Sequence, residues 1–205
     1  MRRILVLPVA AVALTAAVAV GCGSGGGSKA GTGGTAGGST SGAAPHATES
    51  NPPGDIPDNQ AYVLFRPSGG GFTVKVPEGW ARTAKGAVVT YTDKLNRIEV
   101  APATASAAPT TASVTANEVP VLRKQVPTFA LGKVTTVSRP AGTAVLVTYQ
   151  GDSAPDPVTG KVVRDAFERY VFHHNGRQVD LTLSGPVSAD NVDPWRIVSS
   201  SLRWQ

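Results

Sequence analysis

The chain carries few side chains suited to covalent or metal chemistry, and the most distinctive is Cys22. It is the only cysteine among 205 residues, so neither an intrachain disulfide nor a pair of thiolate metal ligands can form. A lone thiol can still act as a nucleophile beside a base, or carry a covalent lipid. Cys22 follows the uncharged apolar run 4–20 and precedes a tract rich in Gly and Ser. This placement favours the lipid.

The segment before Cys22 has the pattern of a secretory signal. Arg2-Arg3 supplies a basic start, and the apolar run is shorter than the roughly 20 residues that span a bilayer. Ala19-Val20-Gly21-Cys22 resembles the lipobox of bacterial lipoproteins, although Ala19 replaces the usual leucine. The resemblance implies that residues 1–21 are removed and that Cys22 is lipidated, with palmitate among its acyl chains. An uncleaved membrane anchor and an ordinary secreted protein are the alternatives.

Gly151-Asp152-Ser153 follows a predicted strand and resembles the nucleophile block of GDSL-type hydrolases. A catalytic serine needs a nearby base. That family supplies it from an Asp-x-x-His near the C-terminus, where this chain has Asp193-Pro194-Trp195-Arg196 and no histidine. We therefore interpret the block as a turn and expect no catalytic residue there.

Two candidate metal sites fail on geometry and ligand number. Calcium needs six or more oxygen ligands, and Asp152, Ser153 and Asp156 supply too few. His173 and His174 are neighbours on a predicted strand and therefore point to opposite faces. We expect no metal site and no cofactor.

Three carboxylates near the predicted hairpin, Asp165, Glu168 and Asp180, raise the possibility of paired acid–base residues. The expected hairpin register places Asp180 opposite Val171 and near Arg169. Opposite charges on neighbouring strands stabilise a sheet. A cross-strand ion pair is therefore the better interpretation of Asp180.

The aromatic and basic residues suggest a packed domain rather than a nucleic-acid-binding one. Trp80, Trp195 and Trp204 could line a ligand groove, but aromatic side chains in such positions more often fill a core. The 19 Lys and Arg residues stand against 14 Asp and Glu and form no long block. We expect no nucleic-acid partner.

The elements that must position these residues are mainly strands. Asn175-Gly176 between two apolar runs predicts a tight hairpin, with His174 opposite Arg177. Tyr170, Phe172, Val179, Leu181 and Leu183 should share one apolar face of it. The further strands are expected at 62–65, 72–76, 87–92, 97–101, 133–138 and 143–150, the last with apolar residues on both faces.

Two helices are expected beside these strands. The first covers 113–126, where Pro120 either kinks the helix or begins a shorter one. The second follows Ser188 or Asn191, either of which can cap it. Hairpins without regular alternation of helix and strand predict one α+β domain at residues 60–205.

Residues 22–59 are mostly Gly, Ser, Thr, Ala and Pro, a composition typical of a disordered linker. A flexible chain of that length reaches roughly 30–35 Å from its anchor. The sequence therefore predicts a lipidated cysteine, a tether and one folded domain.

The segment Gly71–Trp80 and the terminal Ile197–Leu202 resemble PsbP-like domains, a fold shared with LpqN-type lipoproteins and Mog-type Ran-binding proteins. The resemblance implies a mainly antiparallel sheet flanked by helices in an α/β/α sandwich. Together with the lipobox, it implies a non-enzymatic binding or accessory domain on the extracytoplasmic face of the cell membrane. The expected partner is an envelope protein, lipid or glycan. An envelope hydrolase with an unrecognised site and an assembly factor of an envelope complex are the alternatives.

Overall fold

The computed structural model describes residues 52–156 and 158–205. The predicted signal peptide, Cys22 and most of the predicted linker lie outside these residues. Within them, no helix is both long enough and apolar enough to cross a bilayer.

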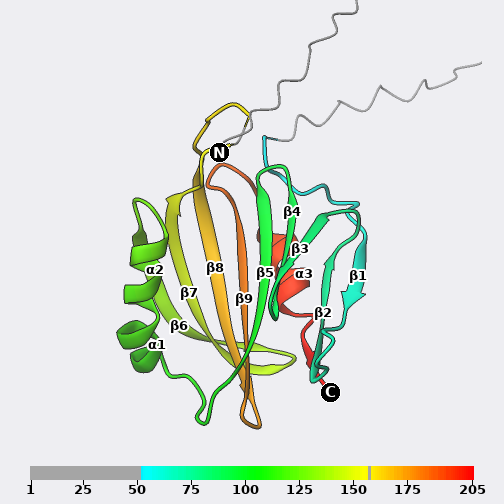
Figure 1. The fold of residues 1–205 in the computed structure, drawn as a ribbon, viewed down its shortest axis with the longest axis vertical. Coiled ribbons are helices and arrows are strands. Elements are labelled where there is room, and N and C mark those ends of the chain that lie inside the picture. Colours follow the sequence, from blue (N-terminus) through cyan, green and yellow to red (C-terminus); the bar gives the residue numbers. More distant parts are fainter. Residues whose placement is uncertain (1–51, 157) are drawn as a thin grey trace, which may run out of the picture. The chain divides into compact units, whose positions relative to one another are not determined.

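A seven-stranded antiparallel sheet forms the centre of the domain (Figure 1). Its order is β3-β4-β5-β9-β8-β7-β6. The strands are β3 (Ala81–Lys85), β4 (Val88–Asp93), β5 (Asn96–Thr104), β6 (Ala130–Arg139), β7 (Gly142–Asp152), β8 (Arg164–His174) and β9 (Arg177–Pro186). All the pairings are antiparallel, so short turns connect most neighbouring strands.

One face of this sheet packs against α3 (Val192–Ser199) and a small second sheet. The second sheet has the order β1-β2-β10, from β1 (Tyr62–Phe65), β2 (Phe72–Pro77) and β10 (Arg203–Trp204). The main core lies between these layers. It includes Val74 of β2, Tyr170 of β8, Leu181 of β9 and Val198 of α3.

The other face carries α1 (Thr111–Asn117) and α2 (Val119–Gln125), which lie over β6 and β7 at the left of Figure 1. Val114 and Leu122 of these helices pack against Val145, Val147 and Val171 of the sheet. Helices therefore flank an antiparallel sheet on both faces. This confirms the predicted α+β class and the α/β/α arrangement.

The central hairpin has the predicted register. His174 pairs with Arg177 across the turn, and Phe172 pairs with Val179. Asn175 and Gly176 both have positive φ, 48° and 76°, as a type I′ turn requires. The five residues predicted to form its apolar face all belong to the main core. The predicted two-sided burial of β7 is also confirmed, because Ala144 faces one core and Val145 the other.

The structure refines or corrects several local predictions. The region expected to be helical at 113–126 forms two short helices, and Pro120 lies in the first turn of the second, which agrees with the alternative that it begins a shorter helix. Thr110 and Ser113 form a capping box that begins α1 earlier than expected. Strand β3 was not predicted; all of its residues are exposed, so it lacks the apolar alternation that marks a strand. Asn191 precedes α3 but makes no side-chain capping bond.

The segment that leads into the domain is held against it. Ile56 is buried, and its backbone N–H donates to Asn191 Oδ1 at 2.9 Å. The carbonyl oxygen of Gly54 accepts hydrogen bonds from Asn96 Nδ2 at 2.7 Å and from Asn191 Nδ2 at 3.0 Å. The packed part of the chain therefore begins no later than Gly54.

Candidate functional site

The face of the sheet beneath α1 and α2 is only partly covered by these helices. On β7 and β8 their side chains bury an apolar cluster. On β9 and β5 the same face is polar, because the strand registers align Arg169 with Thr182 and Thr182 with Glu99. Residues that lie opposite each other on neighbouring strands share a face. A polar floor therefore continues from β8 across β9 to β5.

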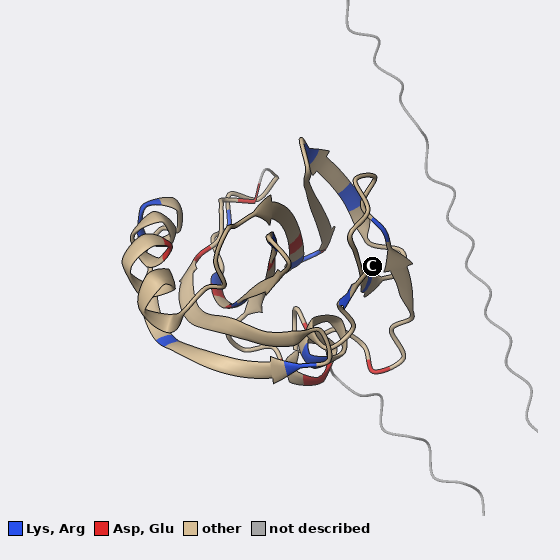
Figure 2. Ribbon diagram, turned by 90° about the horizontal axis from the view of Figure 1, so that it is seen from below, with Lys and Arg blue, Asp and Glu red and all other residues tan. Residues whose placement is uncertain are grey.

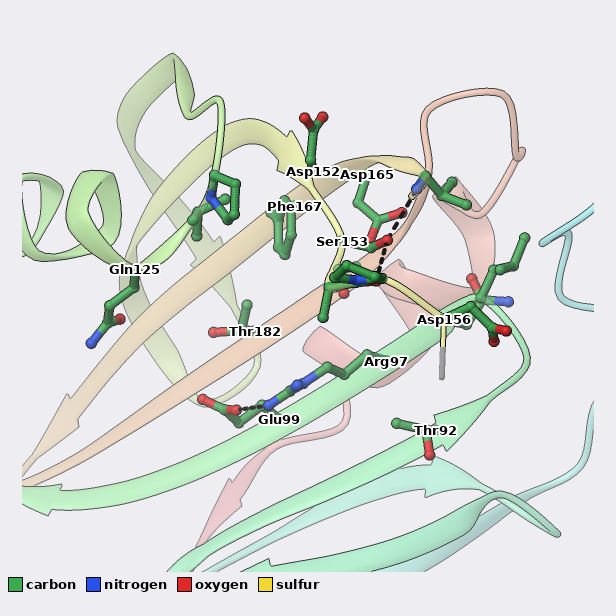
Figure 3. A pocket seen from close by; sticks show the side chains of 18 of the residues that line it. Thr92, Arg97, Glu99, Gln125, Asp152, Ser153, Asp156, Asp165, Phe167 and Thr182 are labelled. Carbon is green, nitrogen blue, oxygen red and sulfur yellow. Dashed lines mark hydrogen bonds and ion pairs between the residues drawn. The ribbon is translucent and has the colours of Figure 1, made fainter. Parts of the chain in front are cut away.

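A groove of about 870 Å³ lies over this floor (Figure 3). One wall of the groove is apolar. Leu122 of α2 and Val126 at its C-terminal end contribute to it, together with Tyr149 and Phe167 of the sheet. The rings of Tyr149 and Phe167 stack, with centroids 4.6 Å apart and planes 6° apart. Burial raises the pKa of Tyr149 to about 12, so its hydroxyl stays protonated at neutral pH. The groove thus offers a ligand both an aromatic surface and polar partners.

The loop after β7 closes one end of the groove. Ser153 Oγ accepts a hydrogen bond from Val163 N at 3.0 Å and donates one to the Ala154 carbonyl at 2.9 Å. Asp156 Oδ1 accepts from Thr159 N at 2.7 Å, and the bonds from Thr159 lower the pKa of Asp156. Ser153 and Asp156 therefore fix the loop.

Asp165 is the exceptional polar residue of the groove. It lies beneath the loop beside Ser153 (Figure 3) and is only 7% exposed. Among the residues that the structure describes, its Oδ1 is the one buried side-chain oxygen or nitrogen without a hydrogen-bond partner. Burial raises the pKa of Asp165 to about 6, and the nearby charge of Asp152 adds to the rise. Buried polar atoms in proteins are nearly always paired, so an unpaired one requires an explanation.

A charge network lies in the floor farther along β8. Arg169 Nη2 donates to Asp180 Oδ2 at 2.6 Å, and Arg169 Nε donates to Glu118 Oε2 at 3.1 Å. Burial raises the pKa of Asp180, and the attraction of Arg169 opposes that rise. The cross-strand ion pair that the sequence predicted is confirmed. It links the sheet to the junction between α1 and α2.

The structure does not bring Ser153 and the domain histidines together. Ser153 contacts Val163, and His173 lies ten residues farther along the same strand, roughly 30 Å away at strand geometry. His173 Nε2 lies 3.0 Å from the Ala105 carbonyl oxygen, and the His174 ring stacks on Trp204 at 5.6 Å. No serine–histidine pair forms between these residues.

The remaining candidates take structural positions. Glu168 Oε2 accepts a hydrogen bond from Tyr170 Oη at 2.6 Å. Trp80, Trp195 and Trp204 all pack against the main core, as predicted, and Trp204 also lines a smaller hollow of about 350 Å³. Within residues 52–156 and 158–205, no three His, Cys, Asp or Glu side chains are grouped to hold a metal ion.

Charge is dispersed over the described domain. Figure 2 shows basic and acidic residues interleaved along the ribbon. In the groove itself, Lys94, Arg97, Lys161 and Arg169 stand beside Glu99, Asp152, Asp156 and Asp165. Recognition in the groove therefore depends on local pairing rather than on a field of one sign.

Sequence reasoning considered Asp165 only as one of three nearby carboxylates and missed its special environment. A signal for it exists in the strand pattern. Asp165, Phe167, Arg169 and Val171 are every second residue of β8. They therefore share one face of the strand, the face that α1 and α2 partly cover. An acid on a buried face without a basic neighbour in register marks a candidate site.

Comparisons with known proteins support the fold. No protein-family model and no curated protein match the chain. Among solved structures, cyanobacterial PsbP (CyanoP) of Synechocystis has a TM-score of 0.51 at 17% identity, covering 71% of this chain and 94% of that one. LpqN of Mycobacterium tuberculosis gives 0.43 at 14% identity, over 72% and 92% of the two chains. The Ran-binding protein Mog1p of Saccharomyces cerevisiae gives 0.45 at 12%, over 63% and 79%.

The likeness to CyanoP confirms the predicted PsbP-like fold. At this identity it describes the architecture alone, since one fold serves many functions. The function must therefore be argued from the groove.

Proposed function

We propose that this chain is a lipid-anchored envelope protein whose PsbP-like domain binds a ligand in the groove and catalyses no reaction. The observation that carries the proposal is the pairing of an apolar wall with the unpartnered Asp165 Oδ1 in one preformed groove. Small-molecule sites are typically concave and largely apolar, with a few polar groups that orient the ligand.

Binding fits the groove better than catalysis does. A hydrolytic site needs a nucleophile within hydrogen-bond reach of a base. Ser153 already bonds Val163 and Ala154, and the domain histidines lie at the far end of β8. Asp165 has a raised pKa, but the hydroxyl of Ser153 beside it bonds Val163 and Ala154 rather than the Asp165 carboxyl. The partner we propose is an envelope lipid, glycan or protein that inserts a small group into the groove.

The anchor is proposed from the sequence. The lipobox at 19–22 supplies a site for lipid, and the linker at 22–59 gives the domain reach from the membrane surface. A tethered binding domain can search the space near its anchor because a flexible linker maintains a high local concentration.

The anchor is tested by expressing the full chain in a bacterium that processes lipoproteins, with radiolabelled palmitate. We expect label in the protein, recovery in the membrane fraction, and loss of both in Cys22→Ala. Ser153→Ala is the matched control and should keep both. Equal labelling of Cys22→Ala and the natural chain would overturn the anchor.

Groove binding is tested with the unlipidated full-length mature chain and fractionated envelope lipids and glycans, followed by amide chemical shifts. Gln125 lines the groove and is exposed, whereas its neighbour Lys124 is exposed but does not line it. We expect a saturable ligand whose binding Gln125→Trp blocks and Lys124→Trp leaves intact. If binding were unchanged by both substitutions, or if no fraction bound, the proposal that the groove binds a ligand would be wrong.

A further inference from the structure

The carboxyl of Asp165 is buried without a counter-charge of its own. It lies opposite Gly151 of β7 and Pro186 of β9, two residues without a polar side chain. Its Oδ1 has no partner among the described residues although the side chain lines the groove. The carboxyl therefore lacks a donor among the described residues, and the groove is the side from which a ligand can approach it.

The arginines nearby are already engaged. Arg164 Nη1 contacts Asp152 Oδ1 at 3.3 Å and donates to the Thr128 carbonyl at 2.8 Å. Farther along the floor, Arg97 pairs with Glu99, and Arg169 pairs with Asp180 and Glu118. Lys94 and Lys161 also line the groove, but neither forms an ion pair with Asp165, so its carboxyl has no positive charge in contact with it.

An apolar surface lies beside this carboxyl. Phe167 is two residues along β8 on the same face, and its ring stacks on Tyr149. Val126 packs against the same cluster and lines the same groove. A ligand that reaches Asp165 therefore passes along an aromatic and aliphatic wall.

We propose that the groove binds a small organic amine, with its ammonium group donating to Asp165 Oδ1 and its apolar body lying against Phe167 and Val126. The inference rests on the proposed binding function and specifies its ligand class. An ammonium group supplies both the missing donor and the missing positive charge, whereas a hydroxyl supplies only the donor. The ammonium also adds a direct attraction between opposite charges, which is stronger in a partly buried site than in bulk water.

The test uses three probes that share a phenyl body: 2-phenylethylammonium, 2-phenylethanol and 3-phenylpropanoate. Each is titrated into the full-length mature chain at pH 7.5 while the amide signals of Ser153, Asp165 and Phe167 are followed by NMR. We expect the ammonium to bind about tenfold more tightly than the alcohol, equal to about 1.4 kcal/mol. The carboxylate should give no saturable shift. Equal affinity for ammonium and alcohol, preference for the carboxylate, or no saturable shift with any probe would overturn the inference.

Variants identify the group responsible. Asp165→Asn should reduce ammonium affinity to that of the alcohol. Asp193→Asn, which removes an exposed acid on α3 at the other face of the sheet, should leave it within about twofold. Phe167→Leu gives an independent check if Asp165→Asn fails to fold. It should weaken ammonium and alcohol equally, because it alters only the apolar wall. Retained preference in a folded Asp165→Asn, or an unaltered affinity in Phe167→Leu, would contradict the assignment.

The outcomes separate this inference from the broader proposal. If an envelope fraction binds in a manner that Gln125→Trp blocks, but the ammonium shows no advantage, only the ligand class is wrong. If neither the fractions nor the three probes bind, both the ligand class and the binding function are wrong.

Discussion

Asn191 Nδ2 donates a hydrogen bond to Asn96 Oδ1 at 3.0 Å, which joins the residue before α3 to the first residue of β5. Both amides also donate to the Gly54 carbonyl, and Asn191 Oδ1 accepts from Ile56 N. The two side chains are buried. This pair therefore holds the N-terminal segment of the domain where the predicted linker would meet it.

Replacing Asn191 with alanine should destabilise the domain and release this segment. The change leaves Ile56 N–H and Asn96 Oδ1 without partners in a buried place, at roughly 1–3 kcal/mol for each group. We expect the free energy of unfolding in urea to fall by about 2–4 kcal/mol and amide exchange at Ile56 to accelerate. The control is Asn59→Ala. Asn59 is exposed and lies three residues after Ile56, so its replacement should change the free energy of unfolding by less than about 0.5 kcal/mol. Similar losses in both variants would contradict this role of Asn191.

The contrast between Asn191 and the Asn175-Gly176 turn explains what the sequence could predict. Asn-Gly acts locally, because its backbone conformation alone selects a tight turn. The register of the hairpin and the ion pair of Arg169 with Asp180 follow from that turn. The position of Asn191 before α3 predicts a side-chain cap, but its side chain instead hydrogen-bonds Gly54 and Asn96, which are distant in sequence.

Strand β3 and the groove could not be predicted from the sequence for a similar reason, because both depend on contacts between distant segments. Strand β3 is exposed throughout, so only its pairing with β4 identifies it. Asp165 has the same sequence features as Glu168, yet one is buried without a partner and the other accepts a bond from Tyr170. Their difference depends on which face each occupies and on where α2 and the loop after β7 end. Strand alternation determines the face, whereas tertiary contacts determine where α2 and the loop end.

Replacing Asp180, which pairs with Arg169 in the buried network, should lower the free energy of unfolding more than breaking the exposed pair of Arg97 with Glu99. The side chains of Arg169 and Asp180 are only 16% and 12% exposed. Asp180→Asn would leave a buried guanidinium with Glu118 as its one remaining carboxylate. We expect a loss of about 2–4 kcal/mol in urea unfolding, since breaking one side of a buried pair leaves an uncompensated charge.

The control is Arg97→Gln in the exposed pair with Glu99, where Arg97 is 53% exposed. Exposed pairs contribute about 0–1 kcal/mol. If Arg97→Gln destabilised the protein as much as Asp180→Asn does, burial of the network would not be the cause.

Gly151 is required for packing rather than for chemistry. A Cβ at this position would overlap Val126 Cγ1 and lie 3.1 Å from the Pro127 carbonyl oxygen. Gly151→Ala should therefore displace the groove wall and cost about 1–3 kcal/mol, as overpacking usually does. Gly69→Ala is the control, because a Cβ there meets nothing within 4 Å. A Gly151→Ala protein with unchanged stability and unchanged amide shifts at Val126 would show that the wall can yield freely.

The buried carboxyl of Asp165 should make stability depend on pH in a defined direction. The pKa of Asp165 is raised to about 6 by burial and by Asp152, whereas an unfolded aspartate has a pKa of about 3.9. Between these values the folded protein holds more protons than the unfolded chain, so stability falls as pH rises. Below about 3.9 and above about 6 this group contributes no slope.

Urea unfolding of the natural chain and of Asp165→Asn at pH 4, 5, 6 and 7.5 measures this effect. Asparagine cannot ionise, so its free energy of unfolding should not fall with pH as that of the natural chain does. Relative to the natural chain, the variant should become more stable by roughly 2–3 kcal/mol between pH 4 and 6, and the difference should stay constant above pH 6. Asp156→Asn is the control: hydrogen bonds from Thr159 lower the pKa of Asp156 below its ordinary value of 3.8, so its own slope has the opposite sign and lies almost entirely below this pH range. A difference between the natural chain and Asp165→Asn that stays constant with pH would mean that Asp165 titrates normally. A carboxyl that titrates normally would still be ionised at pH 7.5, but burial would not disfavour its charged form.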